Sequence, residues 1–221
     1  MLKQMCARAM RFLIGRPGKP RAELSWLEKT FFELRYLFFV FIITFFVVQP
    51  FVVAGYEVPT PSMEPTIMTH TRFIALPSIY GGFFRFTKIK LPGYQKIDRG
   101  DIVMFKAPPD ESLDYVKRAI ALPGDRVTVR GKDVYLNGRL LKESYAHYID
   151  DPGVDRPDFG PVRVPAGHLF VMGDNRDNSW DSRYWGFVPV QNVFGTPLFS
   201  FWSYDVDHHQ IRTGAMFKLI R

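Results

Sequence analysis

The chain has a single cysteine, Cys6, among its 221 residues. An intrachain disulfide is therefore excluded, although a lack of bridges is compatible with either side of a membrane. The sequence also lacks the H-E-x-x-H pattern and paired cysteines, which are the spacings that commonly mark zinc sites. We therefore expect neither a metal ion nor another cofactor.

Most of the chain has little excess charge of either sign. The formal net charge is +7, but residues 1–35 contain eight Lys/Arg against three Glu and account for +5 of it. Only +2 is left for the other 186 residues. A nucleic-acid-binding protein carries its basic surface on the folded domain. We therefore exclude nucleic acid as a partner.

An apolar run without charge follows the basic tail, over residues 36–56, "YLFFVFIITFFVVQPFVVAGY". About 20 mainly apolar residues are needed to cross a bilayer as a helix, and Pro50 would kink or end that helix. Basic residues before the span predict a cytoplasmic amino terminus. A buried core helix is the alternative. The predicted organisation is a cytoplasmic tail over 1–35, a transmembrane helix over 36–56 and an extracytoplasmic, periplasmic domain over 57–221.

Residues after the apolar run lack any long stretch with helical periodicity, and they contain no internal repeat. Short apolar runs over 101–107, 168–174 and 197–204 are bounded by turn-forming residues and indicate strands. Within 126–141, valines alternate with polar residues and Asn137-Gly138 indicates a hairpin turn. Residues 148–161, rich in Pro, Gly and Asp, are expected to form a mobile loop. We therefore predict a mainly β fold: one amino-terminal transmembrane helix, then an antiparallel β-sheet catalytic domain.

The usual partners of a catalytic serine are also missing, because no G-x-S-x-G occurs and no histidine has a suitable context. Ser62 lies in "PTPSMEPTI", where prolines favour a stiff, extended backbone. It is either a bystander in a rigid exit from the membrane or a nucleophile that needs another base. A buried, neutral lysine can serve as that base. Lys117 precedes the apolar residues 119–121, and strand alternation places Arg118 on the opposite face, so that Lys117 would point inward. The alternative is an exposed lysine on an edge strand.

A third segment, "GDNRDNSWDSRYWGFVP" over 173–189, packs polar residues into a short stretch. Asx turns and Asp–Arg pairs predict a well-ordered loop that could present Ser179 or Ser182 to a neighbour. A calcium-binding loop is a weaker alternative, because the D-x-D-x-D-G pattern and its closing glutamate are missing.

Four blocks in order, "PSMEPT", "RGDIVMF", "YVKRAIALPGD" and the 173–189 segment, make the chain resemble a bacterial type I signal peptidase, a membrane-anchored Ser/Lys endopeptidase. The resemblance implies that Ser62 is the nucleophile and Lys117 the general base. It implies that Ser179 orients the lysine amine and that the Thr60 hydroxyl completes an oxyanion hole with the Ser62 N–H. Several relatives have glycine where this chain has Pro61.

Further positions match residues that line the substrate pockets of the family: Tyr56, Val58, Met63, Tyr115 and Val116. Asp181 with Arg118 and Arg183 matches structural ion pairs. The implied substrates are secretory preproteins, cut after small residues at −3 and −1 on the outer face of the cytoplasmic membrane. The enzyme is expected to be a monomer that contacts the phospholipid bilayer.

Two alternatives stay open. One is a specialised Ser/Lys processing peptidase of the pilin or conjugation type. The other is a catalytically silent, membrane-tethered β module that binds a partner. The aromatic stretch over 79–86, "IYGGFFRF", is either a buried hairpin or an exposed edge that dips into the membrane interface. In the second case Phe83 and Phe84 would contact lipid.

Overall fold

The computed structural model describes residues 25–48, 53–81, 92–151 and 153–221. The chain divides into two compact units, residues 1–49 and 50–221. The basic tail largely precedes residue 25, and Pro50, Phe83, Phe84 and Phe86 also lie outside the described residues. The predictions made for them therefore stay predictions.

The described part of the first unit is helical. Helix α2 spans Trp26–Ile43 and continues as a π-helical segment, η2, at Thr44–Val48. The helix thus begins earlier than predicted, because Leu, Glu, Lys and Arg are all good helix formers and charge alone does not end a helix. Among the described residues, no helix combines the length and the apolar character needed to cross a membrane.

The second unit begins as a strand where the sequence predicted the end of the helix. Strand β1, Ala54–Val58, pairs with β2, Thr71–Leu76, and the register places Tyr56 opposite Phe73. The two rings stack with their centroids 6.0 Å apart. The prediction of a helix through Tyr56 is therefore wrong, because the apolar side chains at this end are used for strand packing.

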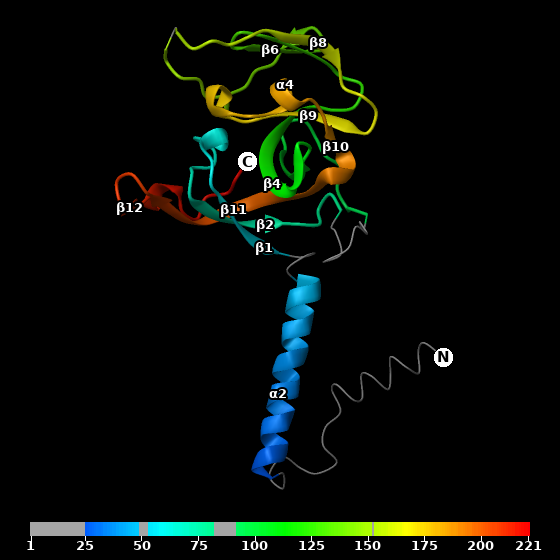
Figure 1. Ribbon diagram of the computed structural model, residues 1–221, viewed down its shortest axis with the longest axis vertical. Helices are drawn as coiled ribbons and strands as arrows, with labels where there is room; N and C mark the ends of the chain where they lie inside the picture. The colour runs from blue at the N-terminus through cyan, green and yellow to red at the C-terminus, as the bar shows by residue number, and fades with distance from the viewer. Residues whose placement is uncertain (1–24, 49–52, 82–91, 152) are drawn as a thin grey trace. The chain divides into compact units, whose positions relative to one another are not determined.

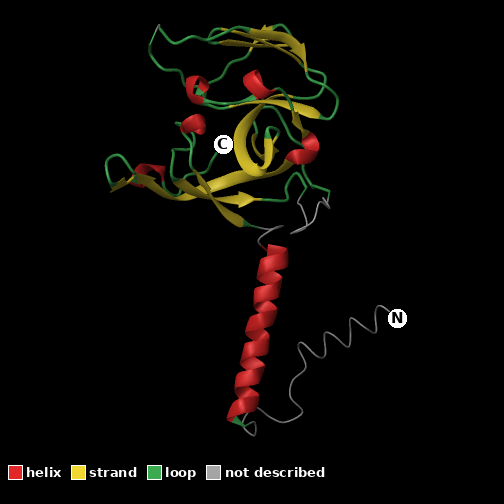
Figure 2. Ribbon diagram, viewed as in Figure 1, coloured by secondary structure: helices red, strands yellow, loops and turns green. Residues whose placement is uncertain are grey.

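The second unit is an antiparallel β domain, as predicted, and strands dominate it (Figures 1 and 2). The larger sheet has the order β1-β2-β11-β3-β4-β9-β10, with β12 paired to β11, and the smaller has the order β7-β6-β5-β8. The remaining strands are β3 Ile102–Ala107, β4 Asp110–Ala121, β5 Arg126–Arg130, β6 Asp133–Leu136, β7 Arg139–Leu140, β8 Phe159–Arg163, β9 His168–Met172, β10 Val188–Pro189, β11 Val193–Asp205 and β12 Gln210–Ile211.

The strand predictions hold for β3, β9 and β11, and the Asn137-Gly138 turn joins β6 to β7 with positive φ at both residues. The loop predicted over 148–161 ends earlier, because Phe159 already starts β8 and packs its ring on Phe170. Short helical segments complete the unit, of which α4, Ser182–Trp185, belongs to the site described below.

The two ends of strand β4 differ in their exposure to solvent. Residues 110–114 are exposed, whereas 118–121 are buried between β3 on one side and β9 on the other. The buried end contributes Ile120 and Ala121 to a cluster that also takes valines from the smaller sheet. Lys117 lies where β4 passes from the edge of the sheet into its interior. Tyr80, in the aromatic stretch, is buried and donates to Asp101 Oδ2 at 2.8 Å, so at that residue the stretch belongs to the core.

Candidate active site

Ser62 lies in a single 3-10 turn, η3, formed by Pro61–Met63. The Glu64 N–H donates to the Pro61 carbonyl at 3.0 Å and closes the turn. The extended backbone predicted here is found at Thr60, which has φ −122° and ψ 150°, but not at Ser62. The reason is that Pro61 fits the first position of a helical turn, where its missing N–H costs nothing.

The nucleophile turn is fixed from the loop after β9. Asn175 donates through its backbone N–H to the Ser62 carbonyl and through Nδ2 to the Pro61 carbonyl, both at 3.1 Å. Because two adjacent carbonyls are satisfied by one residue, the turn is held in a single orientation. Ser62 itself is only 5% exposed.

The Lys117 side chain points at Ser62, and its Nζ donates a hydrogen bond to Ser62 Oγ at 2.5 Å. The exposed edge-strand alternative for Lys117 is therefore wrong, since the residue is 5% exposed. Burial lowers the pKa of its ammonium from 10.5 to about 8, although the carboxylates of Asp181 and Asp174 act in the opposite direction. With a pKa of about 8, about a tenth of this lysine is a neutral amine at pH 7, and the fraction rises to about half at pH 8.

Ser179 lies next to the dyad. Its Oγ accepts from the Gly173 N–H at 3.1 Å, and among the described residues no hydrogen bond joins it to Lys117. A Cβ at Gly173 would lie closer than 3.0 Å to both Ser179 Oγ and the Ser62 carbonyl oxygen. Gly173 is thus the residue that lets the Ser179 loop and the nucleophile turn approach each other.

Thr60 is on the exposed side of the same turn. Its Oγ1 lies 3.3 Å from Ser62 Oγ. The hydroxyl is close enough to the nucleophile to contact an atom bound to Ser62 Oγ, and it has the freedom to rotate towards that atom.

The expected pairing of Arg118 with Asp181 is wrong. Arg118 is 3% exposed and donates to both oxygens of Asp174, at 2.8 and 2.6 Å. The register places Arg118 opposite Met172, so Asp174, two residues further, is the nearer carboxylate. Asp174 also accepts from Thr66 Oγ1 at 2.6 Å. Asp181 instead pairs with Arg183 at 2.9 Å, which agrees with the other half of the prediction.

A pocket of about 500 Å³ opens over the dyad. It is lined by Glu57, Val58, Pro59, Thr60, Pro61, Ser62, Leu113, Asp114, Tyr115, Val116, Lys117, Asn178 and Trp180. Three of the five residues expected to line it, Val58, Tyr115 and Val116, do so. Tyr56 and Met63 do not: both pack behind Val58 in one core cluster. No sequence pattern identifies Trp180 as a pocket residue, because one tryptophan in a polar loop is usually a packing residue.

The pocket runs between β1 and the first half of β4, and in the described part of the chain each of these strands is paired on one side only. Among the described residues, β1 pairs with β2 alone. Within the same ranges, residues 110–117 of β4 pair with β3 alone, since pairing with β9 begins at Arg118. Exposed strand edges present backbone N–H and C=O groups that can pair with an added extended chain.

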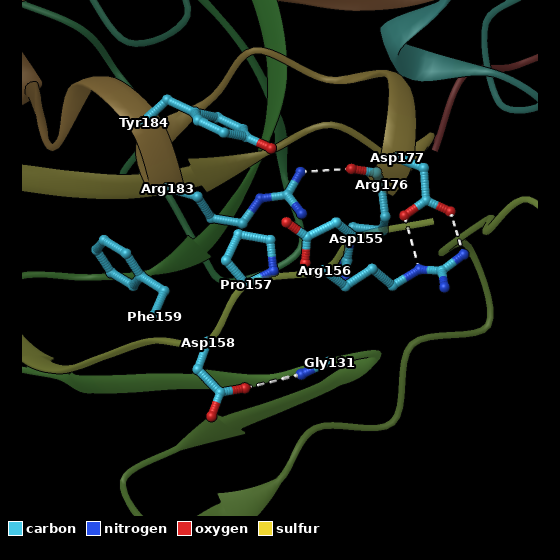
Figure 3. A pocket seen from close by; sticks show the side chains of 10 residues that line it. All are labelled: Gly131, Asp155, Arg156, Pro157, Asp158, Phe159, Arg176, Asp177, Arg183 and Tyr184. Carbon is cyan, nitrogen blue, oxygen red and sulfur yellow. Dashed lines mark hydrogen bonds and ion pairs between the residues drawn. The ribbon is translucent and has the colours of Figure 1, made fainter. Parts of the chain in front are cut away.

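A second, smaller pocket is lined in part by Arg176 and Asp177 of the 3-10 turn η4, Arg176–Asn178 (Figure 3). It measures about 70 Å³ and includes Asp155, Phe159 and Tyr184 in its lining. Its guanidinium groups are engaged: Arg156 binds both oxygens of Asp177, and Arg183 donates to the Arg176 carbonyl at 2.6 Å. Among the described residues, no group of three His, Cys, Asp or Glu side chains is placed to hold a metal ion.

Comparison with known proteins gives consistent matches. A family described as signal peptidase, peptidase S26, matches residues 31–202. A probable signal peptidase I-2 from Synechocystis is 36% identical over 79% of this chain and 75% of its own length. A signal peptidase I from Pseudomonas aeruginosa is 32% identical over 79% of this chain and 70% of its own. A solved signal peptidase I from Enterococcus faecalis is 34% identical, with a TM-score of 0.40 over 46% of this chain and 97% of that one.

Proposed function

Because this chain belongs to the peptidase S26 family of signal peptidases, we propose that it cleaves signal peptides from secreted preproteins, with Ser62 as nucleophile and Lys117 as general base. The observation that carries the assignment of the dyad is the 2.5 Å contact between Lys117 Nζ and Ser62 Oγ inside a pocket. A nucleophile and a base in hydrogen-bonding contact are what acyl transfer requires.

Catalysis begins when the neutral amine of Lys117 accepts the Ser62 hydroxyl proton as Oγ attacks the scissile carbonyl carbon. The tetrahedral intermediate collapses, the C–N bond breaks, and the lysine ammonium gives its proton to the departing amine. The acyl-enzyme is then attacked by water, whose proton passes to Lys117. The bond between the acyl carbon and Ser62 Oγ breaks, and the lysine ammonium returns the proton to Ser62 Oγ, which restores the hydroxyl and the neutral amine. We assign to Ser179, whose Oγ accepts from the Gly173 N–H, the role of limiting where the Lys117 amine can move.

The developing oxyanion needs donors that are fixed before the reaction. We assign this role to the Ser62 N–H and to the Thr60 hydroxyl, which lies 3.3 Å from Ser62 Oγ. Both donors belong to the nucleophile turn, which is hydrogen-bonded to Asn175. Pro61, which has no N–H, is not needed as a donor in this arrangement.

The two strand edges beside the pocket support an extended substrate between β1 and β4. Side chains two residues apart point to the same side of a strand, so the residues at −1 and −3 would face one wall of the pocket. Val58, Tyr115 and Val116 form that wall, with Tyr56 and Met63 packed behind Val58. A filled wall excludes large side chains sterically, which accounts for a preference for small residues.

We further propose that the uncharged segment that starts at Tyr36 and ends before β1 anchors the protein in the cytoplasmic membrane, with the amino terminus inside and the β domain outside. Ser62 lies only eight residues after Ala54, the first residue of β1. A shared bilayer would raise the effective concentration of the substrate's own signal helix. The domain would act as a monomer at the membrane surface.

The test is to incubate the detergent-solubilised protein with a preprotein and to sequence the amino terminus of the product. We expect one cut after a small residue, and none with Ser62→Ala or Lys117→Ala. The two single variants and the double variant should be equally inactive, because the pair acts as a unit. Cleavage by Lys117→Ala would rule out the lysine base. Rescue of cells depleted of a general signal peptidase would separate a general enzyme from a specialised one.

A further inference from the structure

Trp180 and Tyr184 form an exposed stack beside the catalytic pocket. Their ring centroids are 4.8 Å apart and their planes differ by 17°. Trp180 is 56% exposed and Tyr184 51% exposed, so neither ring is buried by the contact. A pair of large aromatic side chains held against each other in solvent presents a flat apolar surface, and such a surface is a candidate binding site.

The backbone that carries the Trp180–Tyr184 stack is held by hydrogen bonds to a buried carboxylate. Trp180 precedes Asp181, the residue that caps α4, and Tyr184 lies within that helix. Asp181 is fully buried and accepts from the Gly173 N–H at 3.1 Å and from Arg183 Nε at 2.9 Å. The backbone segment that carries both rings is therefore tied, through Asp181, to the same glycine that lies beside the nucleophile turn.

The position of the stack relative to the scissile bond follows from the strand directions. β1 and β4 both run towards the dyad, so Glu57 and Leu113 mark the far end of the pocket. Trp180 belongs to neither strand and follows Ser179, which lies against Gly173 and the Ser62 carbonyl. The stack is thus at the dyad end of the pocket. Tyr184 also lines the second pocket (Figure 3). The aromatic surface therefore extends from the catalytic pocket, which Trp180 lines, to the second pocket.

We propose that the Trp180–Tyr184 stack binds the substrate residues that follow the scissile bond. The proposal rests on the peptidase function and adds a site for the first residues of the released protein. Residues before the bond occupy the strand edges, so residues after it must leave past the dyad end. The chemistry of the surface favours an apolar or aromatic side chain there and disfavours a carboxylate, because the face of an aromatic ring is electronegative.

The test compares two peptides that are identical up to the scissile bond. One continues for several residues, with leucine at the second position, and the other ends in glycinamide directly after the bond. Trp180→Ala and Tyr184→Ala should each lower kcat/KM for the long peptide by roughly 3- to 10-fold. Tyr184→Ala should leave the short peptide nearly unchanged, because Tyr184 does not line the catalytic pocket. Trp180→Phe should recover part of the loss. Trp202→Ala is the matched control, because Trp202 is also exposed but does not line the pocket.

A second comparison replaces the leucine of the long peptide with aspartate. The wild-type enzyme should prefer leucine, and the preference should shrink in Trp180→Ala. Equal losses on both peptides, with a lower melting temperature, would mean that the stack only supports the fold and would overturn the proposal. An unchanged kcat/KM for the long peptide would overturn it as well. If the wild-type enzyme cut neither peptide, the peptidase function itself would fail.

Discussion

Lys117 combines two properties that seldom occur together in a lysine: it is buried, and its ammonium is within hydrogen-bonding distance of a serine hydroxyl. Two carboxylates, Asp174 and Asp181, oppose the effect of burial on its pKa. The balance leaves the lysine titratable in the range where an enzyme works, which is the property a general base needs.

The first prediction concerns the pH dependence of cleavage. Only the neutral amine can take the serine proton, so kcat/KM should rise with pH and level off above about 8, the lowered pKa of Lys117. The measurement is kcat/KM for a peptide across this range. An acid limb centred well below pH 7, where a histidine titrates, would contradict the assignment.

The second prediction concerns stability. The unfolded chain keeps a lysine pKa of 10.5, whereas folding lowers it to about 8. Below pH 8 the folded state therefore carries a penalty of up to about 3 kcal/mol, at about 1.4 kcal/mol per pH unit. Lys117→Met should abolish cleavage yet raise the free energy of unfolding at neutral pH. The gain should vanish as pH rises from 8 to 10.5.

Denaturant unfolding at several pH values measures this effect. Lys106→Met is the control, because Lys106 is partly exposed and paired with Asp114 at 2.7 Å. It should bring no gain. A Lys117→Met protein that is less stable than wild type at neutral pH would show that the hydrogen bond to Ser62 outweighs the cost of burial.

The third prediction concerns the oxyanion. Thr60→Val keeps the shape of the side chain and removes its hydroxyl, so kcat should fall by about 10²–10³, as for other single oxyanion donors. Thr60→Ser should retain most of the activity. Full activity in Thr60→Val would assign the role to another group, and the melting temperature checks that the turn is intact.

At the scale of elements, the site depends on how closely the nucleophile turn and the loop after β9 approach. Gly173 permits that approach, and Asn175 bonds the two elements. Gly173→Ala should therefore push the elements apart, lower kcat by about 10² or more and destabilise the fold by about 1–3 kcal/mol. Gly214→Ala is the control, since a Cβ there meets nothing within 4 Å. A fully active Gly173→Ala enzyme would contradict this account.

Much of the element pattern could be predicted because it is local. The alternating valines and the Asn137-Gly138 turn define a hairpin within a few residues, and the apolar neighbours of Lys117 indicate its burial. The orientation of the turn at Ser62 and the partner of Arg118 could not be predicted. The first depends on Asn175 and the second on Asp174, which are brought there only by the pairing of β4 with β9.

The first and last residues of the helix could not be predicted from the sequence either. The predicted helix is bounded by the uncharged, apolar run from Tyr36 to Tyr56. Such a run marks where the sequence is hydrophobic, but it does not mark where the backbone is helical. The helix includes Lys29 and Glu33 at one end. At the other, Tyr56 stacks on Phe73, a residue that no local pattern identifies as its neighbour.

For the whole molecule, the division at residue 50 predicts that the β domain folds alone. A fragment of residues 50–221 should melt cooperatively and cleave peptides with nearly the wild-type kcat/KM. Without segment 36–49 it should be slower than the full chain on preproteins in vesicles, because the shared bilayer no longer raises the effective concentration.

A shorter fragment, residues 59–221, is the control. It lacks β1, which pairs with β2 along its whole length and supplies Glu57 and Val58 to the pocket. It should melt at a lower temperature and lose peptide cleavage. Equal activity of the two fragments would mean that β1 is not part of the site, and equal rates of full chain and 50–221 on vesicles would argue against anchoring.

The open edge of β1 has a consequence for self-association. A strand edge that accepts a substrate can equally accept a second copy of the same chain, and edge-to-edge pairing of this kind leads to aggregates. Here the strand is short, and Pro59 and Pro61 follow it directly. Neither proline has an N–H, so a ladder started on β1 runs out of donors after Val58. The prolines around Ser62 thus restrict the β1 edge to short, reversible pairing with a bound peptide and disfavour aggregation of the protein.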